Sequence, residues 1–350
     1  MEGDKTAFKW VRMDGKFATN MPNPNVGTAS IETDTHGNVL WVALDHDAHR
    51  IGYVLSPKLY EKYGDNITEE QAKHEAVQAM KPFSLEIERL DWMTCYGIGQ
   101  RVAERFHFND YVLLARDAGQ THSSGVAQGM NTGVHDATNL SWKLAGTVKG
   151  WYKPSVLQTY EDERRPSAQK LIEIDKSLAA NSTPDEVLAM IMEETVPFTV
   201  GLGINYTKTA LNNRCSKPGA QIGRIRLYEA NKAAGRWTIL VFAGNTALTA
   251  PSFARLREAL ALETSFAKRY AHIVDLITIV PGIAYSAWTA LEGPAIGKML
   301  LDPDFQAHER YGVLHESGAI VVLRPDTVLG FAADFDCVEE VDKYFTEICT

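Results

Sequence analysis

The sequence predicts a mixed fold of the α+β or α/β class, built in two globular parts. Three short β-rich runs lie within residues 26–55, and helical periodicity extends over about 132–180. Beyond about residue 223, strand and helix patterns alternate again. A chain of 350 residues, 45% of them hydrophobic, can bury a core in each of two domains. We therefore expect domains at 1–180 and 223–350, joined by a helical linker at 181–222.

The first part opens with a predicted β meander. The runs VGTASIETD, NVLWVALD and HRIGYVL are rich in β-branched and aromatic residues, and turn-forming residues separate them at 35–38 and 45–47. A helix is expected at about 68–80, because Thr68 and Gln71 form a capping box ahead of apolar residues at helical spacing.

Helices are expected to dominate the rest of the first part. Residues 111–115 (YVLLA) have the pattern of a short buried strand, and prolines punctuate the helical stretch that follows at 132–180. A second capping box, TPDE at 183–186, predicts another helix. The composition of residues 195–222 favours a linker.

The second part is predicted to hold four strands and two helices, the strands at 237–244, 272–280, 319–325 and 328–334 and the helices at about 251–269 and 336–347. The order β-α-β followed by β-β-α is that of a thioredoxin-like domain. Its first strand is followed by AGNT at 243–246, which contains no Cys-x-x-Cys pair, and disulfide exchange needs a reactive thiolate and a second cysteine. We therefore expect a structural domain without redox cysteines.

Composition narrows the classes of partner and location. The formal net charge of −9 provides no basic field for nucleic acid. No apolar run approaches the roughly 20 residues that span a bilayer, and the N-terminus lacks a signal-peptide core. The four cysteines show neither zinc nor redox spacing, so no metal is expected. These observations predict a cytoplasmic protein with free thiols that binds neither nucleic acid nor membranes.

The most informative pattern lies at 111–165. A strand leads into Arg116-Asp117, and the turn QGMNT at 128–132 leads into a helix; further matches follow in DATNLSWKL at 136–144 and in YEDERRP at 160–166. This pattern resembles the FAD-contacting segment of class A aromatic hydroxylases of the phenol 2-monooxygenase type. The resemblance implies that Asp117 holds the position that binds the ribityl chain. It also implies that the turn sets backbone N–H groups and a helix N-terminus against the flavin.

The resemblance covers essentially the whole chain. LDWMTCYGIGQRVAERF at 90–106 is similar to the strand that precedes this motif in phenol 2-monooxygenases. GRWTILVFAG, LITIV and GAIVVLRPD are similar to their C-terminal thioredoxin-like domain. In those hydroxylases this domain contributes to dimer contacts, so the resemblance implies a homodimer.

Several departures from the family pattern bear on the cofactor. No strand–GxGxxG–helix segment for the ADP half of FAD is recognised, and GLG at 201–203 has the features of a linker. Arg116 replaces a glycine, Ser124 a proline and Ala127 a glycine, and glycine permits close approach and positive φ. We therefore expect a truncated chain, the C-terminal half only, with no bound cofactor. Its vestigial FAD positions are Arg116, Asp117, Gln128, Gly129, Met130 and Asn131.

The resemblance also suggests where an ancestral active site lies. Tyr53 aligns with an active-site tyrosine of phenol 2-monooxygenases, and Asp45 with a nearby family arginine. Tyr53 is alternatively an ordinary strand tyrosine, which we favour. Asp45, with His46, Asp47 and His49, offers acid–base groups, but these residues are also typical of a polar hairpin turn, the better interpretation.

Three further groups are candidates around the former flavin position. His122 lies in the turn and is either a general acid or base facing an empty cavity or a structural loop residue. Arg116 and Asp117 are expected to form an ion pair in the cofactor's place. Trp41, Trp92 and Met130 are candidate pocket residues, although such residues are more often core.

Three functions follow from these observations. The main hypothesis is a flavin-independent, non-redox enzyme of cyclase, pericyclase or isomerase type. It would act on a hydrophobic small molecule, a natural-product intermediate of secondary metabolism, in a pocket derived from a monooxygenase active site. The first alternative is an FAD-dependent aromatic monooxygenase whose N-terminal half is missing or supplied separately. The second is a non-catalytic dimeric binding protein.

Overall fold

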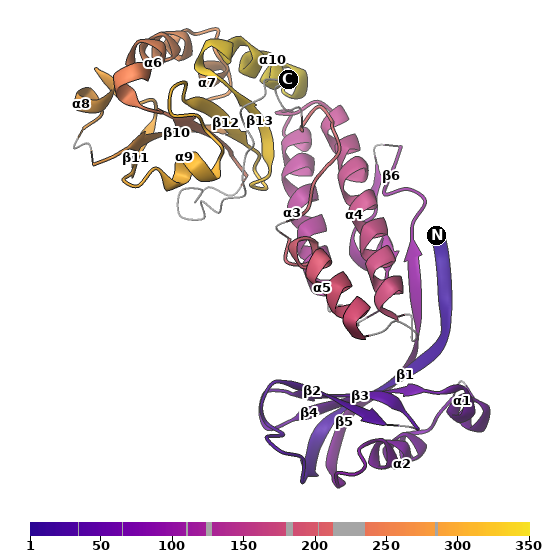
Figure 1. The fold of residues 1–350 in the computed structure, drawn as a ribbon. Helices are drawn as coiled ribbons and strands as arrows, with labels where there is room; N and C mark the ends of the chain where they lie inside the picture. Colours follow the sequence, from indigo (N-terminus) through magenta and orange to yellow (C-terminus); the bar gives the residue numbers. More distant parts are fainter. Residues whose placement is uncertain are drawn as a thin grey trace. The chain divides into compact units, whose positions relative to one another are not determined.

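A computed structural model describes residues 1–33, 35–64, 66–109, 111–123, 128–179, 185–201, 203–212, 235–283 and 286–350 (Figure 1). The chain divides into two compact units. Unit 1 comprises 1–104, 120–127 and 175–180, and unit 2 comprises 105–119, 128–174 and 181–350. Of the residues singled out in the sequence, Ser124, Ala127, Thr183, Pro184 and Cys215 lie outside the described residues. So does the part of the expected linker at 213–222.

Unit 1 is built on a six-stranded sheet in the order β2-β3-β4-β1-β5-β8. Its strands are β1 (Glu2–Thr19), β2 (Thr28–Thr33), β3 (Gly37–Ala43), β4 (His49–Leu55), β5 (Leu85–Val102) and β8 (Gln120–Thr121). Two helices accompany it, α1 (Pro57–Tyr63) and α2 (Glu69–Ala79). The three predicted meander strands are confirmed as β2, β3 and β4.

Helix α2 begins where the sequence predicted. The Thr68 hydroxyl accepts a hydrogen bond from the Gln71 backbone N–H, and the Gln71 side chain accepts one from the Thr68 N–H, so the capping box is present. The buried side of α2, Ala72, Ala76 and Ala79, packs on the sheet in one hydrophobic cluster with β1, β3 and β4. Small side chains on α2 let the helix approach the sheet closely.

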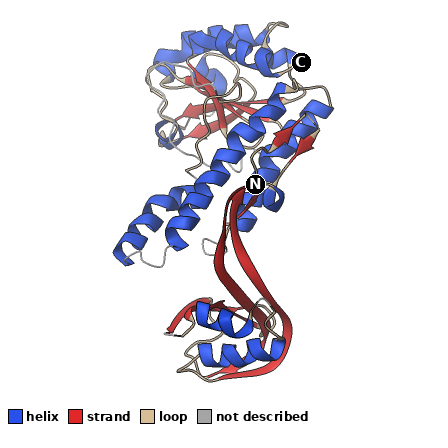
Figure 2. Ribbon diagram, turned by 90° about the vertical axis from the view of Figure 1, so that its right-hand side faces the viewer, coloured by secondary structure: helices blue, strands red, loops and turns tan. Residues whose placement is uncertain are grey.

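The long strands β1 and β5 were not predicted as a pair. Their antiparallel register runs from Glu2 opposite Val102 to Thr19 opposite Leu85, with irregularities on the way. Figure 2 shows them as a long ribbon that continues beyond the shorter strands. Frequent Lys and Gly residues dilute the alternating pattern of β1, and its partners lie far along the chain.

Unit 2 contains a short two-stranded ribbon, a 3-10 turn and three long helices. These are β6 (His107–Phe108), β7 (Val112–Leu113), the turn Arg116–Ala118, α3 (Gly129–Val148), α4 (Ser155–Ala179), whose last turn belongs to unit 1, and α5 (Asp185–Thr199). The buried strand expected at 111–115 is wrong: Tyr111 is 92% exposed, because β7 pairs only with β6 outside the larger sheets. Helix α4 continues through Pro166.

A second sheet has the order β11-β10-β9-β12-β13. Its strands are β9 (Trp237–Phe242), β10 (Val274–Pro281), β11 (Lys298–Asp302), β12 (Ala319–Leu323) and β13 (Leu329–Ala333). The helices are α6 (Thr246–Ala261), α7 (Phe266–Arg269), α8 (Ala287–Leu291), α9 (Gln306–Arg310) and α10 (Val338–Ile348). Strands β9, β10 and β11 are parallel, β12 pairs antiparallel with β9, and β13 pairs antiparallel with β12. The predicted order β-α-β then β-β-α is present, with α8, β11 and α9 between its two halves.

Strand β9 is buried on both faces, as expected of a central strand covered on each side. Trp237, Ile239 and Val241 point into a cluster that includes α6 and α10, whereas Leu240 and Phe242 belong to a second cluster.

The C-terminal sheet is packed against the end of α3 through Tyr152. Its hydroxyl accepts a hydrogen bond of 3.0 Å from Trp237 Nε1, and both residues are buried. A Cβ at Gly146 of α3 would lie 2.0 Å from the Tyr152 ring, so only glycine fits there. The helical pair and the sheet thus share one core.

No helix in the described part of the chain has the length and apolarity that crossing a bilayer requires. Within the same residues, no cluster of His, Cys, Asp and Glu has a metal-binding arrangement.

Candidate functional site

The Arg116–Ala118 turn presents the aspartate that the family pattern singles out. Asp117 is exposed, and the preceding Arg116 has a left-handed backbone with φ of 53°. Its N–H donates a 3.0 Å hydrogen bond to Asp136 Oδ2. Glycine, the residue that the family resemblance implies at position 116, adopts positive φ without strain, whereas Arg116 adopts it at a cost.

The Arg116 side chain lies against helix α3. A Cβ at Gly133 would fall 2.3 Å from Arg116 Nε, so the absence of a side chain at Gly133 makes room for the arginine. The expected ion pair is not formed: between these two described side chains, Arg116 and Asp117, the structure has no salt bridge. The prediction of an Arg116–Asp117 pair is therefore wrong.

Asp136 holds this turn in place from α3. While Oδ2 accepts from the Arg116 N–H, Oδ1 accepts a 2.7 Å hydrogen bond from Arg164 Nε on α4. Asp136 and Arg164 are 1% and 2% exposed. A buried ion pair in a low-dielectric setting positions its partners firmly. The turn that carries Asp117 is thus fixed to the α3–α4 pair.

The N-terminus of α3 has no side-chain cap at its described N-cap residue. Gln128 occupies the N-cap position without a side-chain capping hydrogen bond, and the first intrahelical bond is from Thr132 N to the Gln128 carbonyl. The N–H groups of Gly129, Met130 and Asn131 therefore have no partner inside the helix. Met130 is 72% exposed. Such a helix end favours an anion or a polar ring edge.

Tyr53 lies in the core of unit 1. Its side chain is fully buried, its hydroxyl donates a 2.8 Å hydrogen bond to the Ala72 carbonyl of α2, and its ring meets His36 edge-on at 5.6 Å. Burial raises the pKa of its hydroxyl well above the usual value. This geometry favours the strand-tyrosine interpretation.

Asp45 lies in the β3–β4 turn and is exposed. The turn is tight: Leu44 N donates to the Ala48 carbonyl, and both His46 and Asp47 have positive φ. His49 differs, because it is buried and bonded through Nε2 to Asn25 Oδ1 at 2.8 Å. Asp45 therefore has the surroundings of a hairpin residue, and its catalytic role stays a prediction.

His122 is half-buried, and its Nδ1 lies 2.8 Å from the Ser123 carbonyl. Ser123 in turn donates from its backbone N–H to Asp175 Oδ2 at 2.8 Å, and that oxygen also accepts from Gln100 Nε2 at 2.8 Å. Because one ring nitrogen meets a loop carbonyl, the loop role of His122 has direct support; the acid–base role is a prediction.

The three pocket candidates differ in environment. Trp41 is 1% exposed, donates from Nε1 to the Pro24 carbonyl and stacks beside His49. Trp92 and Met130 are 49% and 72% exposed. Trp41 is a core residue of unit 1, so in this structure it does not line an open pocket.

A buried charge network in unit 2 was not foreseen from the sequence. Glu163 of α4 accepts hydrogen bonds from Asn139 (2.6 Å), Lys143 (2.8 Å) and Asn212 (2.9 Å) and two from Arg324 (2.6 and 2.9 Å). Arg324 also binds Asp326, and Lys143, Glu163 and Arg324 are all inaccessible to solvent. The available signal was on α3, where Asp136, Asn139 and Lys143 share the face that a simple amphipathic helix fills with apolar residues.

The network shifts the titration of its members. Burial raises the pKa of Glu163, but the charges of Arg324 and Lys143 outweigh burial and hold it at about 2. Burial lowers the pKa of Lys143 to about 8 despite the opposing charge of Glu163. All hydrogen-bonding groups of the Glu163 carboxylate are used within the protein, so this network is structural.

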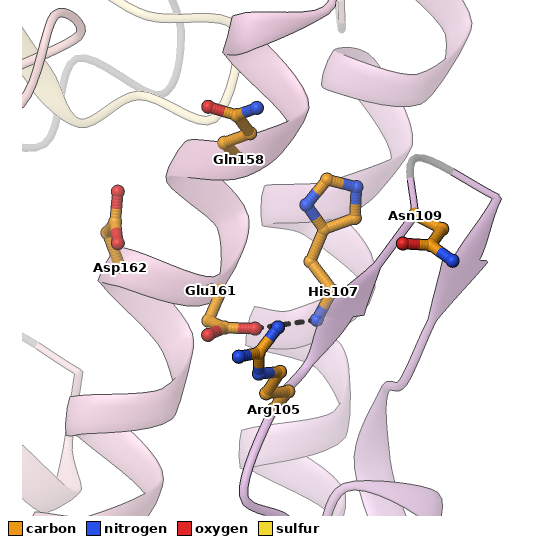
Figure 3. Close-up of a pocket in the computed structure, with 6 residues that line it drawn as sticks. All are labelled: Arg105, His107, Asn109, Gln158, Glu161 and Asp162. Atoms are coloured by element: carbon orange, nitrogen blue, oxygen red, sulfur yellow. Dashed lines mark hydrogen bonds between the residues drawn. The ribbon is translucent and has the colours of Figure 1, made fainter.

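A polar pocket of about 290 Å³ lies between β6 and α4 (Figure 3). It is lined by Arg105, His107, Asn109, Gln158, Glu161 and Asp162. Glu161 is occupied by the backbone, since its Oε2 accepts from the N–H groups of Phe106 and His107, both at 2.7 Å. All six lining residues are polar or charged, whereas ordinary small-molecule sites are lined mostly by apolar side chains.

Comparison with known proteins identifies both parts of the chain. Residues 1–175 match the family "FAD binding domain", and residues 220–350 match "Phenol hydroxylase, C-terminal dimerisation domain". The chain is 30% identical to the phenol 2-monooxygenase fsqG of Aspergillus fumigatus, over 80% of this chain and 55% of that protein. It is 26% identical to the FAD-dependent monooxygenase hkm7 of Aspergillus hancockii, over 99% of this chain and 72% of that protein.

A bacterial relative and two solved structures are also flavin-dependent or monooxygenase proteins by their names. The 3-hydroxybenzoate 4-monooxygenase of Comamonas testosteroni is 28% identical, over 93% of this chain and 61% of its own length. The fold is similar to aklavinone-11 hydroxylase with FAD and aklavinone (TM-score 0.68, 19% identity, 99% of this chain and 63% of that one). It is also similar to the flavin-dependent monooxygenase PieE with FAD and substrate (TM-score 0.67, 15% identity, over 99% of this chain and 66% of that one). The chain thus spans between 55% and 72% of the length of these five proteins.

These matches correct three expectations. A flavin-independent, non-redox cyclase, pericyclase or isomerase is wrong, because half of the chain matches an FAD binding domain and the relatives are monooxygenases. The expectation of no cofactor is wrong for the same reason. The match also begins at residue 1, so it does not support the expected truncation. This chain belongs to the FAD binding domain family of the FAD-dependent monooxygenases, with a phenol hydroxylase dimerisation domain in its C-terminal part.

Proposed function

We propose that this protein takes part in the FAD-dependent hydroxylation of an aromatic compound. The observation that carries the proposal is the N-terminus of α3, whose N-cap residue Gln128 forms no side-chain cap, beside the fixed turn of Asp117, within residues that match an FAD binding domain. Bound FAD supplies redox chemistry: with O₂ and two electrons from a reductant, one oxygen atom enters the aromatic ring as a hydroxyl and the other leaves as water.

The residues present fit a flavin. Asp117 is exposed and offers a carboxylate that accepts hydrogen bonds from a polyol chain. The N–H groups of Gly129, Met130 and Asn131 are unused inside α3 and aim along the helix axis at whatever polar group lies there. Asp117 and the first turn of α3 are therefore the positions that would hold the ribityl chain and the ring edge.

Asp136 and Arg164 act as positioning residues for this site. Their buried pair holds the Arg116 N–H, and with it the left-handed turn that presents Asp117. A site needs such support because small displacements of its groups weaken binding strongly.

Several narrower statements belong to the proposal. The substrate is a hydrophobic aromatic small molecule, in line with the phenol and hydroxybenzoate named for two relatives. The chain is a homodimer through residues 220–350, in line with the description of that family. The domain limits 1–180, 181–222 and 223–350 and the cytoplasmic location also stay predictions.

Absorption spectroscopy and product analysis test this function. The purified protein is titrated with FAD, freed of unbound flavin and examined for flavin bands. Phenol, a nicotinamide reductant and O₂ are then added, and hydroxylated product is sought by mass spectrometry. We expect retained flavin and a product carrying one oxygen atom from O₂. The Asp117→Ala variant should retain much less flavin, whereas Asp304→Ala, at an exposed aspartate of the C-terminal part, should behave as wild type. A protein that remains colourless with excess FAD would overturn the proposal.

A further inference from the structure

The polar pocket between β6 and α4 has walls that are bonded to each other. Glu161 of α4 accepts hydrogen bonds from the backbone N–H groups of Phe106 and His107, both at 2.7 Å, and so holds β6 against the helix. The Tyr160 hydroxyl donates to the Leu114 carbonyl at 2.9 Å, directly after β7. Because these bonds fix both walls, the pocket is formed before a ligand arrives, which lowers the cost of binding.

The lining side chains come from two separate segments of the chain. Gln158, Glu161 and Asp162 are three and four residues apart on α4, a spacing that sets side chains on one side of a helix. The other three come from β6 and the residues that flank it (Figure 3). Polar groups from distant parts of the sequence thus converge on one space.

Four of these side chains have hydrogen-bonding groups that the protein does not use. Within the part of the chain that the structure describes, they form no side-chain hydrogen bond or ion pair: Arg105, Asn109, Gln158 and Asp162. A guanidinium offers donors only, an ionised carboxylate acceptors only, and the two amides offer both. A ligand with both donors and acceptors would satisfy all four.

The pocket contains a cation and an anion that do not pair with each other, Arg105 and Asp162. Partial desolvation and the neighbouring charges of Glu161 and Glu163 raise the pKa of Asp162. A positive group beside Asp162 would relieve this repulsion, whereas a negative group would be favoured beside Arg105. The pocket therefore matches a ligand that carries one charge of each sign.

We propose that this pocket binds a small zwitterion, a molecule with one ammonium and one carboxylate group such as an amino acid, with its carboxylate at Arg105 and its ammonium at Asp162. Asn109 and Gln158 bind its remaining polar groups. The volume of about 290 Å³ is at the lower end of the roughly 300–1,000 Å³ of small-molecule pockets, which suits a ligand of this size. A lining of six polar side chains does not suit the hydrophobic substrate proposed above, so this site does not depend on the proposed activity.

Isothermal titration calorimetry on the full chain tests the site. Glycine, β-alanine and γ-aminobutyrate carry the two charges at increasing separation, whereas acetate and methylammonium carry one charge each. We expect at least one zwitterion to bind about tenfold or more tightly than either singly charged ion, because both charged contacts then add to the binding free energy. Acetate binding as tight as that of the zwitterions, or no binding of any zwitterion at millimolar concentration, would overturn the proposal.

Two variants assign the two ends of the ligand. Arg105→Met and Asp162→Asn each remove one charge from the pocket and should weaken zwitterion binding about tenfold or more. The matched controls, Arg310→Met and Asp304→Asn, remove the same charges at exposed sites of the C-terminal part and should bind as wild type does. Circular dichroism confirms that all four variants fold. Unchanged affinity in either pocket variant would place the zwitterion elsewhere and overturn the proposal.

Discussion

Arg324 forms two hydrogen bonds with Glu163, from Nη1 to Oε1 at 2.6 Å and from Nη2 to Oε2 at 2.9 Å, with both side chains fully buried. The two residues are 161 positions apart in the sequence. Their bond connects α4, next to the proposed flavin turn, with the end of β12 in the C-terminal sheet. The stability of the α3–α4 helices should therefore be coupled to that of the C-terminal sheet, both within unit 2.

Removing the arginine should destabilise the protein strongly. In Arg324→Met, Glu163 and Asp326 stay buried with less compensation, and we expect a loss of about 3–5 kcal/mol in the free energy of unfolding. Urea unfolding followed by tryptophan fluorescence measures it. The exposed pair of Arg255 and Asp336 is the control, and Arg255→Met should cost only about 0–1 kcal/mol. Equal losses in the two variants would show that the buried pair contributes no more to stability than the exposed pair does.

The pH dependence of stability should report Glu163. Its pKa is about 2 in the folded protein against 4.5 ordinarily, so its ionised form stabilises the fold above about pH 4.5. That contribution is lost as the pH falls from 4.5 towards 2. We expect Glu163→Gln to be less stable at neutral pH and to lose less further stability across this acidic window. Urea midpoints at several pH values test it, and Glu316→Gln, at an exposed site, should keep the wild-type slope.

Position 116 should limit flavin affinity. Arg116→Gly removes the side chain packed at Gly133 of α3, beside the helix end that the proposal assigns to the flavin. The strain of the left-handed residue is present without FAD, so its relief, on the order of 1 kcal/mol, should appear as higher stability and not as affinity. If the side chain hinders the cofactor, we expect FAD to bind about fivefold more tightly, a difference of about 1 kcal/mol, as measured by quenching of flavin fluorescence. Thr327→Gly changes another left-handed residue, remote in sequence from the turn, and should leave FAD affinity unchanged. Weaker binding by Arg116→Gly would show that the arginine itself contacts the cofactor.

Tyr53 should contribute to stability rather than to chemistry. Tyr53→Phe loses the hydrogen bond to the Ala72 carbonyl, which costs about 1 kcal/mol. We expect unchanged FAD affinity and unchanged turnover of an aromatic substrate. A fall in turnover of about a hundredfold or more, without loss of folding, would instead assign Tyr53 to proton transfer.

Gly146 should be intolerant of any side chain. A Cβ there would collide with the Tyr152 ring, so Gly146→Ala should cost about 1–3 kcal/mol, measured as the shift in urea midpoint. Gly97→Ala is the matched control, because no atom lies within 4 Å of its added Cβ. Stability loss in Gly97→Ala as large as in Gly146→Ala would exclude the packing explanation.

Local signals in the sequence predicted many of the elements correctly. Thr68 and Gln71 define the start of α2 by their own side chains, and the apolar run WTILVF at 237–242 could only be a buried strand. Strand β1 was missed because it forms by pairing with the distant segment Leu85–Val102, and no pattern within residues 2–19 predicts that pairing. The strand expected at 111–115 is present only as Val112–Leu113, and its expected burial was wrong: it pairs with the short β6, and Tyr111 and Val112 are exposed.

The candidate site could also be predicted only in part. Asp117 and the turn at 128–131 were located by a contiguous sequence motif. The roles of Asp136 and Arg164 in fixing that turn could not be predicted, because Asp136 contacts the Arg116 backbone and Arg164 only after α3 and α4 pair. The left-handed backbone at Arg116 likewise follows from the folded turn rather than from the residue type.

The pairing of Glu2–Thr19 with Leu85–Val102 has a consequence for synthesis on the ribosome. At about 5–20 residues per second, some 4–17 s separate the emergence of β1 from that of its partner β5. During this interval, the β5-facing edge of the newly made strand β1, which includes Val11, Met13 and Phe17, has no partner strand. A chaperone that binds the nascent chain before β5 is made should therefore raise the yield of folded protein. Changes in the conditions used to refold the complete chain should raise it less, because β1 and β5 are then present together.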